Sequence, residues 1–96
     1  MQYFYRAHTT PEQVMTFARG FFGGRGFNAS GAGDIQTFTD PRGAVKLSVE
    51  IEGGHYVRVT AGTTDVGESE IDRVAKRFLS ELHASEEPGH AVRGAY

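Results

Sequence analysis

The sequence predicts a single α+β domain, in which an antiparallel sheet of about five strands packs against two helices. Residues 44–62 alternate apolar and polar side chains, which is typical of a half-buried β-hairpin. Residues 71–82 repeat apolar side chains at steps of three and four, which indicates an amphipathic helix. Residues 10–13 form a helix-start signal ahead of a second apolar stripe. The predicted order of elements is β-α-β-β-β-β-α.

The long hairpin has one apolar face and one charged face. Directly paired residues share a face of a sheet, so its loop must contain an odd number of residues. A loop of residues 52–54 meets this condition and puts Gly54 in a left-handed conformation, which glycine adopts readily. A loop of residues 53–55 ranks second, because it puts His55 in the strained position. The first loop predicts the pairs Ile51–His55, Val49–Val57, Leu47–Val59 and Val45–Ala61.

The other face of the hairpin carries both signs of charge, from Lys46, Glu50, Glu52 and Arg58. We expect a solvated face with cross-strand ion pairs, in which diagonal pairing brings Glu50 near Arg58. A carboxylate-based site is the alternative. General acid–base catalysis needs a pKa shifted by burial or by a neighbouring charge, and an open face offers little of either.

A first strand and a helix precede the hairpin. Residues 2–8 predict a strand whose facing stays open, because aromatic side chains occupy both parities. Thr10 predicts a helix N-cap, since Pro11 follows at the first helical position and Gln13 has capping-box spacing. The helix is expected to run to about Phe22, where two glycines end it.

Two short strands are expected between this helix and the hairpin. They span about residues 26–30 and 34–39, with a glycine-rich turn at 31–33. Residues 40–43, Asp-Pro-Arg-Gly, match the residue preferences of a β-turn.

The last helix is expected over about residues 68–84. Ser69 and Asp72 have capping-box spacing, although Asp65 is a rival cap. The polar positions of the helix mix both signs, which is typical of a solvated face; they are Asp72, Arg73, Lys76, Arg77, Ser80 and Glu81.

Size, charge and composition narrow the classes of function. The 96 residues predict one domain over 1–85 with a polar tail over 86–96. The net charge of −2 argues against a dedicated nucleic-acid binder. The chain has no cysteine, no signal-peptide pattern and no apolar run approaching about 18 residues. We therefore expect a cytoplasmic protein with no membrane span.

The predicted layout resembles two known families over about residues 2–84. The order β-α-β₄-α is similar to one half of a TATA-binding-protein-like domain. The opening strand that leads through TTPEQV (9–14) into a helix, and the long helix after the last hairpin, resemble helix-grip proteins of the START and polyketide-cyclase type. The first resemblance implies a sheet that binds DNA. The second implies a cavity for a small ligand between the sheet and the last helix.

Motifs for catalysis, metals and cofactors are weak. The glycine-rich stretch 20–33 could start a G-x-G-x-x-G pattern at Gly24, but its sixth position is Ala29, and the stretch follows a helix instead of a strand. The four histidines are far apart and form no H-x-x-x-H pair. We therefore expect no enzyme activity, no cofactor and no metal.

Aromatic side chains are numerous for so small a core, and any surplus would mark a dimer surface or an apolar pocket. Adjacent helix positions cannot both face the same way, which makes Phe21 and Phe22 the pair to follow. Ligand or interface contacts are predicted at Phe21, Phe22, Tyr56, Phe78 and Leu82. Contacts with phosphates or an acidic partner are predicted at Arg73, Lys76 and Arg77.

The favoured hypothesis is a small non-enzymatic binding or protein-interaction module. We expect a homodimer, because exposed sheet edges can pair between two copies. One alternative is binding of a small apolar ligand between the sheet and the last helix. The other is nucleic-acid binding through the sheet or the basic cluster, which the net charge disfavours. No membrane partner is expected.

Overall fold

The computed structural model describes residues 1–54, 56–65 and 69–86. Its order is β-α-β-β-β-β-α, so the predicted fold class is confirmed. Residues 87–96 of the predicted tail lie outside the described residues, whereas Glu86 belongs to the last helix. The elements are β1 (Gln2–Ala7), α1 (Pro11–Gly23), β2 (Asn28–Ala32), β3 (Ile35–Asp40), β4 (Gly43–Glu52), β5 (Tyr56–Thr63) and α2 (Glu70–Glu86).

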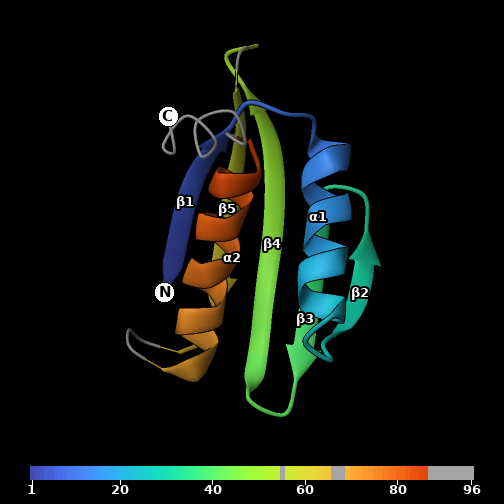
Figure 1. The fold of residues 1–96 in the computed structure, drawn as a ribbon, viewed down its shortest axis with the longest axis vertical. Helices are drawn as coiled ribbons and strands as arrows, with labels where there is room; N and C mark the ends of the chain where they lie inside the picture. The colour runs from blue at the N-terminus through green and yellow to red at the C-terminus, as the bar shows by residue number, and fades with distance from the viewer. Residues whose placement is uncertain (55, 66–68, 87–96) are drawn as a thin grey trace, which may run out of the picture.

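The strands form one antiparallel sheet in the order β1-β5-β4-β3-β2. Both helices lie on one face of this sheet, with α2 near β1 and β5 and α1 near β3 and β2 (Figure 1). We call the opposite face, which neither helix covers, the outer face. Side chains that point to it include Phe4, Arg6, Ile35, Lys46, Ser48, Glu50, Glu52, Tyr56, Arg58 and Thr60.

The first helix begins as predicted. Thr10 Oγ1 accepts the N–H of Gln13 at 3.1 Å, and Pro11 stands in the first turn. At the other end, the Gly24 N–H donates to the Gly20 carbonyl at 3.0 Å. The helix therefore satisfies backbone groups at both ends from its own sequence.

The register of the β4–β5 hairpin corrects the first-ranked prediction. Glu52 pairs with Tyr56, so the loop is residues 53–55, which is the second-ranked alternative. Gly53 and Gly54 both take positive φ angles, of 63° and 74°. Both glycines adopt this conformation without a Cβ penalty, so both can belong to the loop. The loop therefore starts at Gly53, one residue later than the first-ranked prediction. The observed pairs include Ile51–Val57, Val49–Val59 and Leu47–Ala61.

The predicted apolar face of the hairpin is buried except at its tip. Val45, Leu47 and Val49 are buried, whereas Ile51 is 70% exposed. The tip of the hairpin extends past both helices (Figure 1). The side chain of Ile51 lies on the same face of β4 as the buried Val45, Leu47 and Val49, but no helix covers this end of the sheet.

The strand that follows α1 starts later than predicted. Phe27 turns inward before β2 begins, and its N–H donates to the Phe22 carbonyl at 3.0 Å. The first strand, whose facing the sequence left open, directs Tyr3 and Tyr5 toward the helices and Phe4 toward the outer face.

Phenylalanine side chains form the centre of the core. The rings of Phe22 and Phe38 stack with 4.5 Å between their centroids, and Phe22 also contacts Phe27 and Phe78 at 5.2 Å. Phe21 contacts Phe22 at 5.0 Å and Phe78 at 5.5 Å. Edge-to-face and offset ring pairs of this kind stabilise a core beyond the area they bury.

The prediction that Asp72 lies on the solvated face of the last helix is wrong, because its side chain is fully buried. Its Oδ1 accepts the hydroxyls of Tyr3 at 2.8 Å and Thr63 at 2.7 Å. Its Oδ2 accepts the Ser69 hydroxyl at 2.6 Å, and Ser69 accepts the Asp72 N–H at 3.2 Å. Burial alone would raise the pKa of Asp72, but the hydrogen bonds from Ser69, Thr63 and Tyr3 lower it below its ordinary value.

Candidate ligand cleft

A cleft opens where the end of β1, the start of α1 and the last turn of α2 meet. Its volume is about 380 Å³, which lies within the range of small-molecule sites. Two apolar side chains, Phe17 and Leu82, line it together with several polar ones. We call this the helix-end cleft; its polar lining is His8, Thr9, Gln13, Ser85 and Glu86.

The Glu86 carboxylate is held in place by the first strand. Its Oε1 accepts the hydroxyl of Tyr5, and its Oε2 accepts the backbone N–H of His8 at 2.9 Å. The two donors come from residues 81 and 78 positions earlier in the chain. The half-buried carboxylate is therefore fixed in one orientation at the cleft.

A histidine completes this polar group. Tyr5 Oη lies 3.1 Å from His83 Nδ1, and the two rings meet edge to face at 5.5 Å. Since the hydroxyl donates its one hydrogen to Glu86, a hydrogen bond with His83 requires the proton on Nδ1. On the α1 side, the Thr9 hydroxyl donates to Gln13 Oε1. The lining of the cleft is thus partly pre-organised.

The outer face carries a second group of interacting side chains, on β1, β4 and β5. Arg6 Nε donates to Glu52 Oε1 at 2.9 Å, and Arg58 Nη1 lies 3.7 Å from Glu52 Oε2. The Arg58 guanidinium also lies over the Phe4 ring, 4.4 Å from its centroid. The hydrogen bond that Arg6 donates to Glu52 raises the pKa of Arg6. Phe4, Arg6 and Arg58, together with Tyr5, line an open hollow of about 600 Å³.

The side chains predicted to contact a ligand or a partner protein lie in three different places. Phe21, Phe22 and Phe78 are core residues, so these three rings are used in packing. Leu82 is buried and borders the helix-end cleft. Tyr56 lies on the outer face, with its ring 5.4 Å from that of His8.

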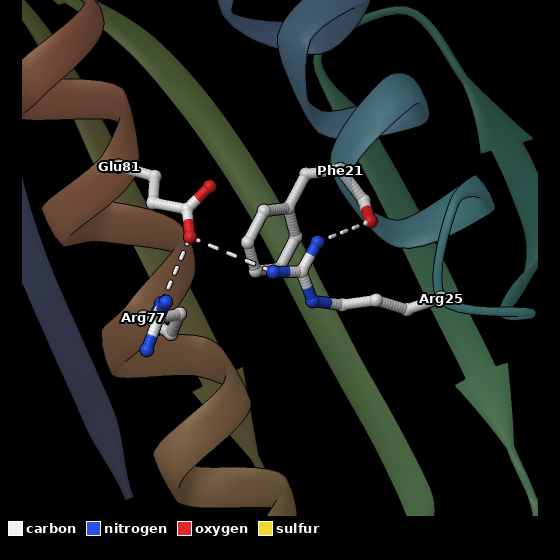
Figure 2. Close-up of polar contacts among 4 residues, drawn as sticks. All are labelled: Phe21, Arg25, Arg77 and Glu81. Carbon is white, nitrogen blue, oxygen red and sulfur yellow. Dashed lines mark hydrogen bonds and ion pairs between the residues drawn. The ribbon is translucent and has the colours of Figure 1, made fainter.

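The predicted basic cluster lies on the exposed face of α2, but its charge is partly compensated. Arg77 Nε donates to Glu81 Oε2 at 2.8 Å. Arg25, in the segment after α1, reaches the same oxygen at 3.5 Å (Figure 2). The Lys76 ammonium lies 5.4 Å from the centre of the Tyr3 ring. Arg73 is exposed.

Arg25 also shields the last turn of α1. Its guanidinium lies 3.8 Å from the centroid of the Phe21 ring, and its Nη1 donates to the Phe21 carbonyl at 3.2 Å (Figure 2). Phe21 and Phe22 therefore both become buried although adjacent helix positions diverge. Phe22 packs on the sheet, while Phe21 packs toward α2 under the arginine.

Sequence patterns do not identify Tyr5, His83 and Glu86 as a group. Their separation along the chain hid them, because periodicity relates residues only within one element. The predicted tail includes Glu86, whereas α2 continues two residues beyond its predicted end. The one hint of this polar group in the sequence is that His8 follows a predicted strand and His83 lies near the end of a predicted helix.

No protein-family model matches this chain, and no curated protein matches it significantly in sequence. Over residues 1–54, 56–65 and 69–86, no group of three His, Asp or Glu side chains is placed to hold a metal ion. Within the same residues, neither helix has the length and apolar character needed to cross a membrane.

Proposed function

We propose that this protein is a small non-enzymatic binding module and that the helix-end cleft binds its ligand. The proposed ligand is a small molecule with an apolar body and a cationic or hydrogen-bond-donating head group. One observation carries the proposal: the Glu86 carboxylate is fixed beside two apolar side chains in a cleft of about 380 Å³.

The charge of the lining favours a cationic head group. Among the described residues that line the cleft, Glu86 is the one acidic side chain, and there is no lysine or arginine. Each of its oxygens accepts one protein hydrogen bond, and a carboxylate oxygen has two lone pairs. A ligand ammonium group would meet unused acceptor positions. Charge-assisted hydrogen bonds of this type are about twice as strong as neutral ones.

Calorimetric titration with three matched probes tests this proposal. We expect 2-phenylethylammonium to bind more tightly than 2-phenylethanol, and phenylacetate to bind most weakly. The three probes share the phenyl ring that contacts Phe17 and Leu82, so their differences report the head group. Equal affinity for all three, or no binding of any, would contradict the proposal.

Two variants separate the contributions of the carboxylate and the apolar lining. Glu86→Gln removes the charge and leaves one acceptor oxygen for either the Tyr5 hydroxyl or the His8 N–H, so the ammonium probe should lose about tenfold in affinity and the alcohol less. Leu82→Trp should fill the cleft and weaken all three probes. Glu70→Gln, at the opposite end of α2, is the matched control and should change nothing.

The resemblance to helix-grip proteins supports this class of ligand. Phe78 is fully buried and contacts three other phenylalanine rings. Because these rings fill the space directly beneath α2, we do not propose a ligand cavity there. We therefore propose a helix-grip-like relationship with the ligand displaced to the helix ends, in preference to a TATA-binding-protein-like one. We also propose the cytoplasm as its compartment, because a chain without cysteine needs no oxidising environment.

Self-association as a homodimer is a second candidate function, favoured by the outer face. Phe4, Ile35 and Tyr56 are 53%, 54% and 41% exposed there. Large apolar side chains gathered on one face are typical of an interaction surface. Sedimentation velocity over a range of protein concentrations tests this proposal, and a sedimentation coefficient that stays monomeric at millimolar protein would refute it.

A further inference from the structure

We infer that two copies of the chain pack outer face against outer face, about a two-fold axis that runs parallel to the strands between β4 and β5. This inference rests on the homodimer proposed above and names its interface. The occupant of the outer face is thus a second copy of the chain.

The first support is the distribution of charge over neighbouring strands. Arg58 on β5 lies directly opposite Glu50 on β4 in the register of the sheet, yet its ion pair is with Glu52. Among the described residues, the structure gives Glu50 no ion pair of its own. Arg6 lies on β1, next to Arg58 on β5. Near the hairpin tip, the basic side chains of the outer face therefore lie on β1 and β5, and the acidic ones lie on β4.

A two-fold axis between β4 and β5 places a basic side chain of one copy opposite an acidic side chain of the second copy. The operation lays β5 of one copy over β4 of the second copy, and β4 over β5. Arg58 then faces Glu50 of the second copy, and the same contact occurs twice. Sheets that pack face to face keep their strands within about 30° of one another, which this axis allows.

The second support is one row of side chains that crosses the outer face. Phe4 pairs with Thr60, Thr60 with Ser48, and Ser48 with Ile35. The two central side chains are small, whereas the flanking ones are large, apolar and more than half exposed. The same axis places Phe4 opposite Ile35 of the second copy and Thr60 opposite Ser48. Apolar groups therefore meet at both flanks.

A two-fold axis perpendicular to the strands is less favourable. Set at the row of Ser48 and Thr60, it would lay β5 on β5 and β4 on β4, so that Lys46 faces Glu50 while Arg58 faces Gly62. Both arginines of this face would then lack an acidic residue opposite them. Pairing through the edge strands β1 or β2 would leave the outer face uncovered.

Charge reversal in the full-length chain tests the interface. In Glu50→Arg, two arginines of one copy would face two of the other, and in Arg58→Glu the same holds for carboxylates. We expect each variant alone to raise the dimer dissociation constant at least about tenfold, because like charges oppose one another across the interface. An equimolar mixture of the two variants should restore dimerisation, since every contact in the heterodimer is then oppositely charged.

Melting curves of both variants by circular dichroism keep loss of folding apart from loss of association. The mixture provides a second safeguard, because restored association requires both chains to be folded. Glu70→Arg, a reversal on α2, is the matched control and should dimerise like the unmodified chain.

The remaining outcomes each overturn a defined claim. A strictly monomeric unmodified chain would overturn both the homodimer and this interface. A dimer that neither reversal weakens would overturn only the interface and indicate pairing through a sheet edge. Restoration by Lys46→Glu in the Glu50→Arg chain, with no effect of Arg58→Glu, would establish the perpendicular axis instead.

Discussion

Asp72 shows how a single carboxylate can be buried without a cationic side chain. Three hydroxyl groups, from β1, β5 and the residue before α2, donate to its two oxygens. Each hydroxyl comes from a different part of the chain, so the carboxylate ties the start of α2 to two strands. The buried oxygens are satisfied, which is what a buried charge requires.

Asp72→Asn should lower the free energy of unfolding by about 1–3 kcal/mol at neutral pH, because the amide nitrogen cannot accept a hydroxyl hydrogen. The folded-state pKa of Asp72 lies below its ordinary value of about 3.9, so its contribution to stability is present above that pH. The contribution is lost as the pH falls through the folded-state pKa. Chemical denaturation of both proteins at several pH values measures this effect.

The difference in stability between the two proteins should therefore shrink as the pH falls from about 5 to about 2. Asp40 has its pKa lowered by the hydrogen bonds from Arg42, but it is present in both proteins and its contribution cancels. A difference that stays constant over this range would contradict the assignment.

Arg25 and Arg77 share the Glu81 carboxylate but should differ in importance. Arg25→Ala removes the guanidinium above the Phe21 ring together with a hydrogen bond to a helix carbonyl, and we expect a loss of about 1 kcal/mol. Arg77→Ala removes an exposed pair between positions four residues apart, and should cost less than about 0.5 kcal/mol. Equal losses in thermal or urea denaturation would contradict this ranking.

At the scale of elements, the hairpin loop depends on two consecutive glycines with positive φ. Gly53→Ala and Gly54→Ala should each destabilise the protein by about 1 kcal/mol, because a Cβ makes the left-handed conformation unfavourable. Gly20→Ala is the control. This residue is in α1, nothing lies within 4 Å of an added Cβ, and the change should stabilise the helix by up to about 1 kcal/mol. Urea denaturation of the three variants checks the pattern.

The types and order of the elements could be predicted because each is encoded locally. Thr10 and Pro11 start one helix, and alternation over residues 44–62 identifies the longest hairpin. The register of this hairpin could not be predicted. Loops of residues 52–54 and 53–55 both keep the apolar side chains on one face, so the apolar pattern cannot distinguish them.

The burial of Asp72 and the composition of the helix-end cleft were beyond reach for a different reason. Both depend on contacts between β1 and α2, which lie at opposite ends of the sequence. A carboxylate on a helix with mixed charges gives no local signal of the hydroxyls that surround it. The same holds for Glu86 and the strand-end groups that fix it.

At the scale of the whole molecule, two helices on one face of a sheet create two separate surfaces. The ends of the helices frame a cleft with a fixed carboxylate, and the uncovered face presents exposed rings and charges of both signs. Ligand binding and self-association are therefore proposed at different places and can be tested independently. A charge reversal at Glu50 should leave the affinity of the ammonium probe unchanged.

Titration of the full-length chain with 2-phenylethylammonium, followed by ¹H–¹⁵N NMR, tests the central proposal most directly. We predict saturable shifts that concentrate on the backbone amides around the helix-end cleft, namely those of His8, Thr9, Gln13, Ser85 and Glu86. The shifts should largely disappear in Glu86→Gln. An unperturbed spectrum, or shifts confined to the outer face around Phe4 and Arg58, would contradict the assignment of this cleft as the binding site.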